Sequence, residues 1–165
     1  MATIRLVWTP GSSITSTGQL IKRKNGIGAF TTIDTVSSVV NIYDDSTASN
    51  NVLYTYKVTN QCVTGSTVDS DLIQVSNITC PIITLTPGST TIIVDLPILT
   101  GDVEYVSIVL YNGLGVVVST QAISGQSTVH HTFTGLTSST YYTGIVVLSD
   151  GVFTKNCSFS TNTTV

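Results

Sequence analysis

Two histidines occur in the 165-residue chain, and they are adjacent, at His130 and His131. An imidazole can serve as a general base or as a metal ligand near neutral pH. The surrounding alternation predicts a strand, and successive strand residues point to opposite faces of a sheet. The two rings therefore cannot bind one metal ion together. We expect one to face the core and the other to face solvent or a partner.

Carboxylates are dense at two places, Asp44-Asp45 and Asp69/Asp71. Calcium takes six to eight oxygen ligands at a compact site, and no EF-hand spacing is present. A weak calcium contact at Asp69 and Asp71 is one interpretation. Turn formation, in which an Asp side chain bonds its own backbone, is the interpretation we favour. No paired acid and base and no G-x-S-x-G elbow are found, so the sequence predicts no enzyme, no metal and no cofactor.

Three cysteines, Cys62, Cys80 and Cys157, form no C-x-x-C pair, which argues against a zinc site. An odd number is unusual for a disulfide-stapled secreted domain, so we expect three free, partly buried thiols. The predicted hairpin separates Cys62 from Cys80 by roughly 25 Å. Since a disulfide needs Cα atoms within about 7 Å, we expect no bond between these two.

Half of the six basic residues fall in one run, Lys22-Arg23-Lys24. Alternation sends Lys22 and Lys24 to one face of a strand and Arg23 to the other. One interpretation is an edge strand whose charges prevent self-pairing. The other is a docking patch for an acidic partner. Both remain open at this stage.

Charged residues make up only 9% of the chain, and the net charge is −3. A nucleic-acid-binding protein that neutralises phosphates needs many more Lys and Arg, so we expect no nucleic-acid partner. The apolar start of the chain is interrupted at Arg5 and stops at Pro10, which is too short for a secretory leader. No apolar run has the ~18 residues of a membrane helix, so we expect neither export nor a membrane partner.

Thr, Ser, Val and Ile contribute 29, 20, 21 and 16 residues, and three of these types are β-branched. β-Branching favours strands, so the chain should be all-β. Ile4, Leu6 and Trp8 alternate with more polar neighbours, as in a half-buried strand. Asn25-Gly26 and Asn112-Gly113 predict hairpin turns. The further strands predicted are 19–24, 30–33, 36–43, 51–62 and 70–78, then 82–86, 90–96, 103–111, 116–120, 129–134, 141–149 and 153–160.

An internal repeat appears at an offset of 87. It aligns 5–10 with 92–97, 25–28 with 112–115, and 53–58 with 140–145. We therefore predict two copies of one module, at residues 1–79 and 80–165. Strands every 8–12 residues with Gly and Asn turns indicate a sandwich or a barrel.

The chain resembles two tandem fibronectin type III domains, which are immunoglobulin-like β-sandwiches. Leu6-Val7-Trp8 is similar to the family's second strand, and the stretches 51–58 and 135–141 are similar to its sixth. The stretch from Leu136 to Tyr141 resembles the family's tyrosine corner. Two departures stand out. Asp95 occupies the place of Trp8, and no counterpart of the strand at 82–86 precedes the first matched strand, so module one should lack its first strand and leave a sheet edge open.

Bare modules of this kind resemble virion structural proteins of tailed bacteriophages. That resemblance implies a non-enzymatic role in a neck or head–tail connector ring, a tail, or a capsid decoration. The partners would be other virion subunits and copies of this chain in a symmetric assembly, with the virion put together in the host cytoplasm. Sparse charge is consistent with surfaces covered by other subunits. The alternative is a cell-surface adhesin or glycan-binding module, in which Trp8 and the Tyr residues would stack on sugars.

Overall fold

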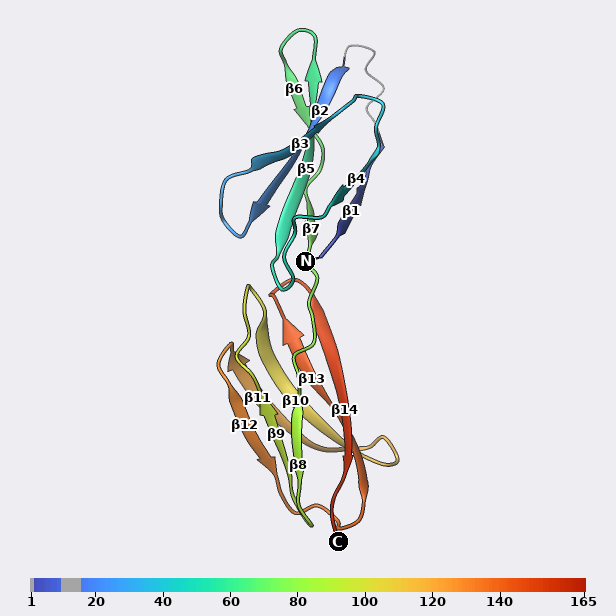
Figure 1. The fold of residues 1–165 in the computed structure, drawn as a ribbon, viewed down its shortest axis with the longest axis vertical. Helices are drawn as coiled ribbons and strands as arrows, with labels where there is room; N and C mark the ends of the chain where they lie inside the picture. Colours follow the sequence, from blue (N-terminus) through green and yellow to red (C-terminus); the bar gives the residue numbers. More distant parts are fainter. Residues whose placement is uncertain (1, 10–15) are drawn as a thin grey trace. The chain divides into compact units, whose positions relative to one another are not determined.

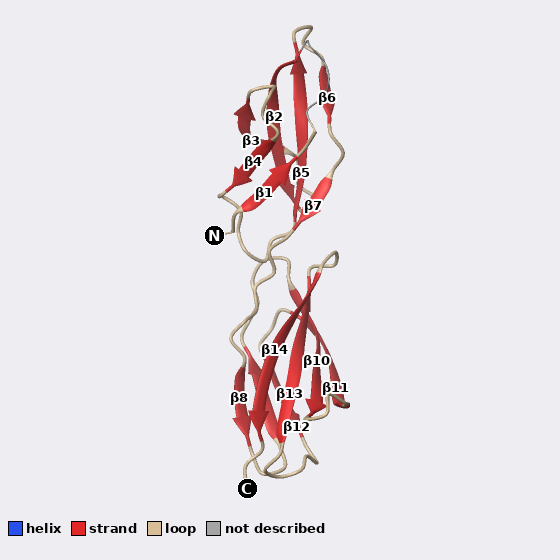
Figure 2. Ribbon diagram, turned by 90° about the vertical axis from the view of Figure 1, so that its right-hand side faces the viewer, coloured by secondary structure: helices blue, strands red, loops and turns tan. Residues whose placement is uncertain are grey.

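The computed structural model describes residues 2–9 and 16–165, and every regular element in them is a β-strand (Figures 1 and 2). The all-β expectation is confirmed. None of the described residues form a helix that could cross a membrane. The chain divides into two compact units, Met1–Asn77 and Ile78–Val165, here called module one and module two. This division lies two residues before the boundary we expected from the repeat.

Module one contains two sheets. The first pairs β1 with β4, and the second has the order β3-β2-β5-β6, with β7 also paired to β5. Every pairing is antiparallel. The strands are β1 (Ile4–Val7), β2 (Ser16–Asn25), β3 (Thr31–Val36), β4 (Ile42–Asp45), β5 (Tyr54–Cys62), β6 (Thr67–Asp69) and β7 (Ile73–Val75).

Module two has a three-stranded sheet of order β12-β9-β8 and a four-stranded sheet of order β11-β10-β13-β14. The strands are β8 (Thr84–Pro87), β9 (Ile92–Leu96), β10 (Glu104–Asn112), β11 (Val117–Gly125), β12 (Val129–Phe133), β13 (Tyr141–Ser149) and β14 (Thr154–Asn162). All seven strands expected in this module are present, with ends shifted by a few residues. Both Asn-Gly turns form, between β2 and β3 and between β10 and β11.

Two strand predictions in module one were wrong. The single strand expected at 36–43 is replaced by the end of β3 and the start of β4, with a turn between them in which Val40 N donates to Ser37 O at 3.0 Å. The strand expected at 70–78 is present only as the short β7, while a separate strand, β6, lies before it, and Ser70 interrupts the ladder between them. Its backbone N–H bonds Val58 O at 2.8 Å and its hydroxyl accepts from Val58 N at 3.0 Å.

The repeat is present in the structure, but its register differs from the sequence alignment. Strand β1 pairs with β4 in the same way as β9 pairs with β12. Ile4 is opposite Asp45, and Ile92 is opposite Phe133, so equivalent residues of these strands are 88 positions apart. β2 and β10 keep the offset of 87, with Ile21 and Ile108 both fully buried, and the residues paired to these two, Asp34 and Gln121, keep it as well. In the structural register the counterpart of Trp8 is therefore Leu96 and not Asp95.

The tyrosine corner corrects the alignment in the same way. The hydroxyl of Tyr54 accepts from Ser49 N at 3.2 Å, and the hydroxyl of Tyr142 accepts from Thr137 N at 3.0 Å. We expected Tyr141 in this role, but Tyr141 is 48% exposed and points away from the core. Adjacent tyrosines occupy opposite faces of β13, and the sequence offered no way to choose between them.

Each module has a core of its own between its two sheets. In module one the fully or nearly buried apolar residues are Ala2, Ile4, Leu6, Ile21, Ala48, Tyr54, Tyr56 and Val58. In module two they are Ile92, Val94, Leu96, Leu99, Val103, Tyr105, Ile108, Leu110, Phe133, Leu136, Tyr142, Val146, Leu148 and Cys157. The second core is the larger and more aliphatic of the two.

The expectation of three free thiols was wrong. Cys80 and Cys157 form a disulfide, with their Cα atoms 5.5 Å apart, and Cys62 is the free cysteine. The bond ties the segment before β8 to β14. Because Cys80 is bonded to Cys157, the expectation that Cys62 and Cys80 form no bond is confirmed. Counting cysteines could not reveal this pair, because the third thiol lies in the other module.

Candidate interaction surfaces

The run Lys22-Arg23-Lys24 lies on β2, and β2 is an interior strand between β3 and β5. The interpretation of an edge strand was therefore wrong. The alternation is as expected, since Arg23 is paired with Tyr56 on the core side while Lys22 is opposite Lys57 on the outer side. The three residues therefore do not form one surface.

Arg23 belongs to a buried polar network. Its Nη1 donates to Asp45 Oδ2 at 2.6 Å and to Thr47 Oγ1 at 3.0 Å, and its guanidinium lies 4.6 Å from the Tyr54 ring centre. Asp45, whose side chain is fully buried, also accepts from the Tyr56 hydroxyl at 2.8 Å and from Thr47 N at 2.9 Å. These contacts fix the side chains that fill this part of the core.

The network shifts the acid–base properties of its members. Burial alone would raise the pKa of Asp45, but the hydrogen bonds from Thr47, Tyr56 and Arg23 outweigh burial and hold that pKa below its usual range. Burial and the neighbouring carboxylate raise the pKa of the Tyr56 hydroxyl well above its usual value. Asp45 therefore stays charged and Tyr56 stays neutral near pH 7. No signal in the sequence pointed to this pairing across 22 residues.

The outer face of the same sheet carries a basic patch, defined as Lys22, Lys24 and Lys57, and the Phe30 ring lies beside two of these lysines. The ammonium of Lys57 lies 4.7 Å from the Phe30 ring centre, and that of Lys24 lies 5.2 Å from it. Lys57 is also paired with Asp69 at 2.6 Å, which lowers the pKa of that carboxyl. Lys22 and Lys24 thus remain candidates for docking an acidic partner. The sequence analysis did not include Lys57 in this patch, because it lies 33 residues beyond Lys24 in the chain.

A second surface lies at the open side of β1. In the described residues β1 pairs with β4 alone, whereas its counterpart β9 lies between β12 and β8. A groove of about 300 Å³ separates β1 from β5 and β7. Its lining residues are Arg5, Leu6, Val7, Trp8, Thr9, Tyr56, Lys57, Val58, Ser70, Asp71, Ile73 and Val75.

A third surface is the edge strand β11 of module two. No Asp, Glu, Lys or Arg occurs between residues 113 and 129, and Val116, Val117 and Val118 are 58%, 53% and 44% exposed. Edge strands are usually protected by charges, proline or bulges that oppose pairing with another chain. β11 has register shifts near its start and its end but no charge, whereas β14, the other edge of this sheet, carries Lys155.

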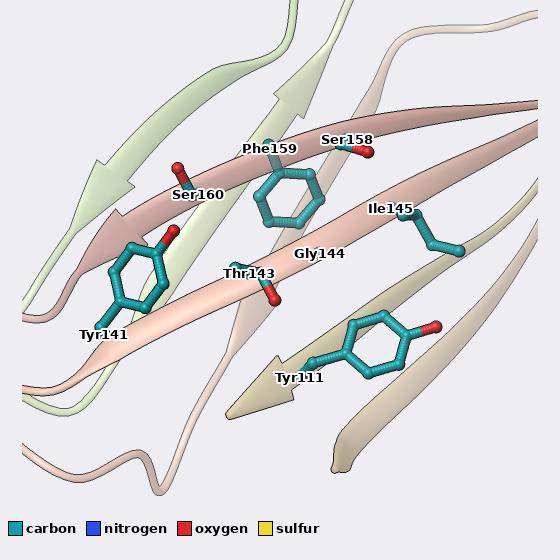
Figure 3. Close-up of a pocket in the computed structure, with 8 residues that line it drawn as sticks. All are labelled: Tyr111, Tyr141, Thr143, Gly144, Ile145, Ser158, Phe159 and Ser160. Atoms are coloured by element: carbon teal, nitrogen blue, oxygen red, sulfur yellow. The ribbon is translucent and has the colours of Figure 1, made fainter. Parts of the chain in front are cut away.

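The four-stranded sheet of module two also carries an open hollow of about 490 Å³ (Figure 3). Tyr111 and Tyr141 border it, and Figure 3 shows the Tyr141 ring on one side of Thr143 and Ile145 on the other. Phe159 lies over Gly144, where a Cβ atom would overlap the ring. A paired strand thus supplies the large side chain that Gly144 lacks.

The remaining candidate groups are held by structural contacts. His130 pairs with Asp95 at 2.5 Å on the exposed side of β12, while the His131 ring packs edge-on against Phe133, with ring centres 4.6 Å apart. The opposite faces expected for the two histidines are confirmed. Asp44 forms two short bonds to Arg5, both of 2.7 Å. Among the described residues no group of three or more His, Cys, Asp or Glu is placed to hold a metal ion.

Comparison with known proteins identifies the fold. The sequence matches no protein-family model and no curated protein. Among solved structures, a two-domain fibronectin type III segment of chicken tenascin is similar to 98% of this chain over 92% of its own length, with 11% identity and a TM-score of 0.67. The chicken interferon gamma receptor alpha chain is similar over the same shares, with 14% identity and a TM-score of 0.52. The fold is therefore all-β, with two tandem immunoglobulin-like sandwiches of the fibronectin type III kind.

Proposed function

We propose that this chain is a non-enzymatic structural subunit that is held in a larger particle by protein–protein contacts. The observation that carries the proposal is the combination of sparse charge with apolar strand edges. The edge strand β11 and the open side of β1 both expose valines, at Val117 and Val7. Fully buried interface cores are depleted of charged residues, so such edges suit contact with other subunits. The solved structures of similar fold support the sandwich architecture, which many functions share.

The particle that we propose is the virion of a tailed bacteriophage. The support is the resemblance of two bare sandwich modules to neck, tail and capsid-decoration proteins. The partners would be other virion subunits and copies of this chain. Unequal charge between the modules favours self-assembly, because module one has five basic and five acidic residues, while module two has one basic and four acidic residues. Module two of a neighbouring copy is thus an acidic surface that Lys22 and Lys24 could meet.

Co-sedimentation tests the proposal. Lysate of the producing culture is fractionated on a density gradient, and each band is searched for this chain by peptide mass spectrometry. We expect the chain in a particle band, at a fixed ratio to the major capsid protein that reflects ring or shell symmetry. Recovery only as free or cell-surface protein would contradict the virion role.

A paired charge reversal tests the basic patch. We expect Lys22→Glu with Lys24→Glu to leave folding intact and to reduce incorporation into the particle, because both lysines lie on the outer face. Arg23→Glu is the matched contrast on the same strand, and it should unfold module one because it puts two carboxylates together. Unfolding by the double lysine variant would show that the lysines are structural.

A glycan-binding or adhesin role is the second candidate. The hollow bordered by Tyr111 and Tyr141 favours it, because exposed aromatic faces can stack on sugar rings. We expect a glycan array to give saturable binding that Tyr141→Ala removes and that Tyr43→Ala, in module one, preserves. Binding that survives Tyr141→Ala would contradict a site at this hollow.

A further inference from the structure

The two modules differ most clearly at one sheet edge. In module two, β8 pairs with β9 in the register Thr84 to Asp95 and Leu85 to Val94, and Leu85 packs against the core. β1 is the counterpart of β9. None of the described residues of module one takes the place that β8 takes in module two. The repeat itself thus shows what kind of element fits beside β1.

Main-chain groups at this edge are directed outward. The backbone N–H groups of Ala2 and Trp8 donate to Ala48 O and Asn41 O, at 3.0 and 3.1 Å, on the β4 side. In an antiparallel ladder the bonding direction alternates from residue to residue. The N–H and C=O groups of Arg5 and Val7 therefore point away from β4. They are the groups that would form a ladder with an added strand.

The groove beside these groups has apolar walls. Val7 of β1 and Ile73 of β7 both line it, and they are 70% and 54% exposed. Leu6 and Val58 form its floor as part of the core. The break between β6 and β7 contributes Ser70 and Asp71 to the groove, whereas their counterpart β14 (Thr154–Asn162) is continuous. An added strand with apolar residues at alternate positions would cover these side chains.

The two basic residues in the walls are already paired, and Asp71 is the one further charged residue among the groove's lining residues. Arg5 is paired with Asp44 at 2.7 Å, and Lys57 is paired with Asp69 at 2.6 Å. An acidic strand would find no unpaired base in these walls and would lose water on entering. The remaining lining residues apart from Asp71 are apolar or uncharged, so an uncharged strand matches most of the groove. The β8 segment of this chain has that character, because residues 81–94 contain no Asp, Glu, Lys or Arg.

We propose that module one is an acceptor for a β-strand from a partner chain. The strand is extended and uncharged, has apolar side chains at alternate positions, and adds antiparallel to β1 with its apolar side chains in the groove. In such strand addition the main-chain bonds supply affinity and the alternate side chains supply specificity. The inference rests on the proposed role in assembly, for which it names a contact. Its test uses the isolated chain, so the two can fail separately.

Trp8 makes the test direct, because it borders the groove and is the one tryptophan of the chain. The probe is a synthetic peptide with the sequence of residues 81–89, titrated into the full chain. We expect a saturable change in Trp8 fluorescence, with the largest amide NMR shifts and new exchange protection at Arg5 and Val7. The same peptide with Asp at the position of Leu85 should bind at least tenfold more weakly.

Two variants of the chain localise the contact. Ile73→Asp puts a charge in the groove wall and should weaken peptide binding at least tenfold. Ile27→Asp is its matched control, because Ile27 is exposed at the β2–β3 turn, and it should bind as the unchanged chain does. Val7→Pro removes an outward N–H while leaving the β4-facing bonds of its neighbours, and it should also weaken binding.

Three results would overturn the inference. The first is no binding of the peptide at millimolar concentration. The second is binding that Ile73→Asp and Val7→Pro leave unchanged. The third is a Trp8 signal that depends on the concentration of the chain without peptide, which would make a second copy the occupant of the groove. Absence of the chain from the particle band would overturn the virion role and leave strand acceptance standing.

Discussion

Replacing Asp45 tests whether module one depends on its buried ion pair. The carboxylate accepts hydrogen bonds from Arg23, Thr47 and Tyr56, and its side chain is fully buried. Removal of one partner of a buried pair leaves the other charge uncompensated, which costs about 3–5 kcal/mol. Small domains are stable by about 5–15 kcal/mol, so Asp45→Ala should remove a large part of the stability of module one.

Tryptophan fluorescence isolates the effect to one module. Trp8 belongs to module one, and its indole N–H donates to Gln19 Oε1 at 3.0 Å, so unfolding changes its surroundings. At about 4–8 °C per kcal/mol for a domain of this size, Asp45→Ala should lower the midpoint of the Trp8 thermal transition by at least about 12 °C. Far-UV circular dichroism should retain a second transition that belongs to module two.

Asp44→Ala is the matched control, because Asp44 is the preceding residue on β4 and also pairs with an arginine. That pair is exposed on both sides, at 65% for Arg5 and 42% for Asp44. Water and salt screen such pairs, so the Trp8 midpoint should hardly move. Equal shifts for Asp44→Ala and Asp45→Ala would refute the reasoning, because burial would then not decide the cost.

Three further predictions follow from the same contacts. Because the folded-state pKa of Asp45 is depressed, its contribution to the stability of module one is present above the unfolded pKa of about 3.9 and is lost as pH falls through the folded pKa. Acid titration followed by tryptophan fluorescence should show this loss below about pH 4. Asp45→Asn should flatten the dependence of stability on pH. Cys157→Ser opens a disulfide loop with a sequence separation of 77 and should destabilise module two by about 4 kcal/mol in calorimetry, whereas Cys62→Ser should not. Val117→Lys should reduce self-association in sedimentation equilibrium, whereas Val39→Lys, at an exposed residue outside any strand, should leave it unchanged.

The sequence predicted those features that depend on local pattern. Alternation located most strands, and the Asn-Gly pairs located two hairpin turns, because both signals lie within a few residues. The repeat predicted two modules of one kind.

Features that depend on partners far apart in the sequence could not be predicted. Alternation placed Arg23 on the face opposite Lys22, but no local signal showed that Asp45 would meet it there. The Cys80–Cys157 bond spans a whole module, and cysteine counting argued against it. The one-residue register error had the same origin, because an ungapped alignment cannot show that β2 and β10 follow an offset of 87 while the other matched strands follow 88.

The structural register shows that the two modules fill equivalent core positions by different physics. Arg23 and Asp45 in module one correspond to Leu110 and Phe133 in module two, both of which are nearly or fully buried. A buried ion pair can often be replaced by apolar residues of similar volume at little cost or with a gain in stability. Arg23→Leu combined with Asp45→Phe should therefore destabilise module one less than Asp45→Ala alone. A double variant less stable than the single one would show that the surrounding packing, including Tyr56, has adapted to the ion pair.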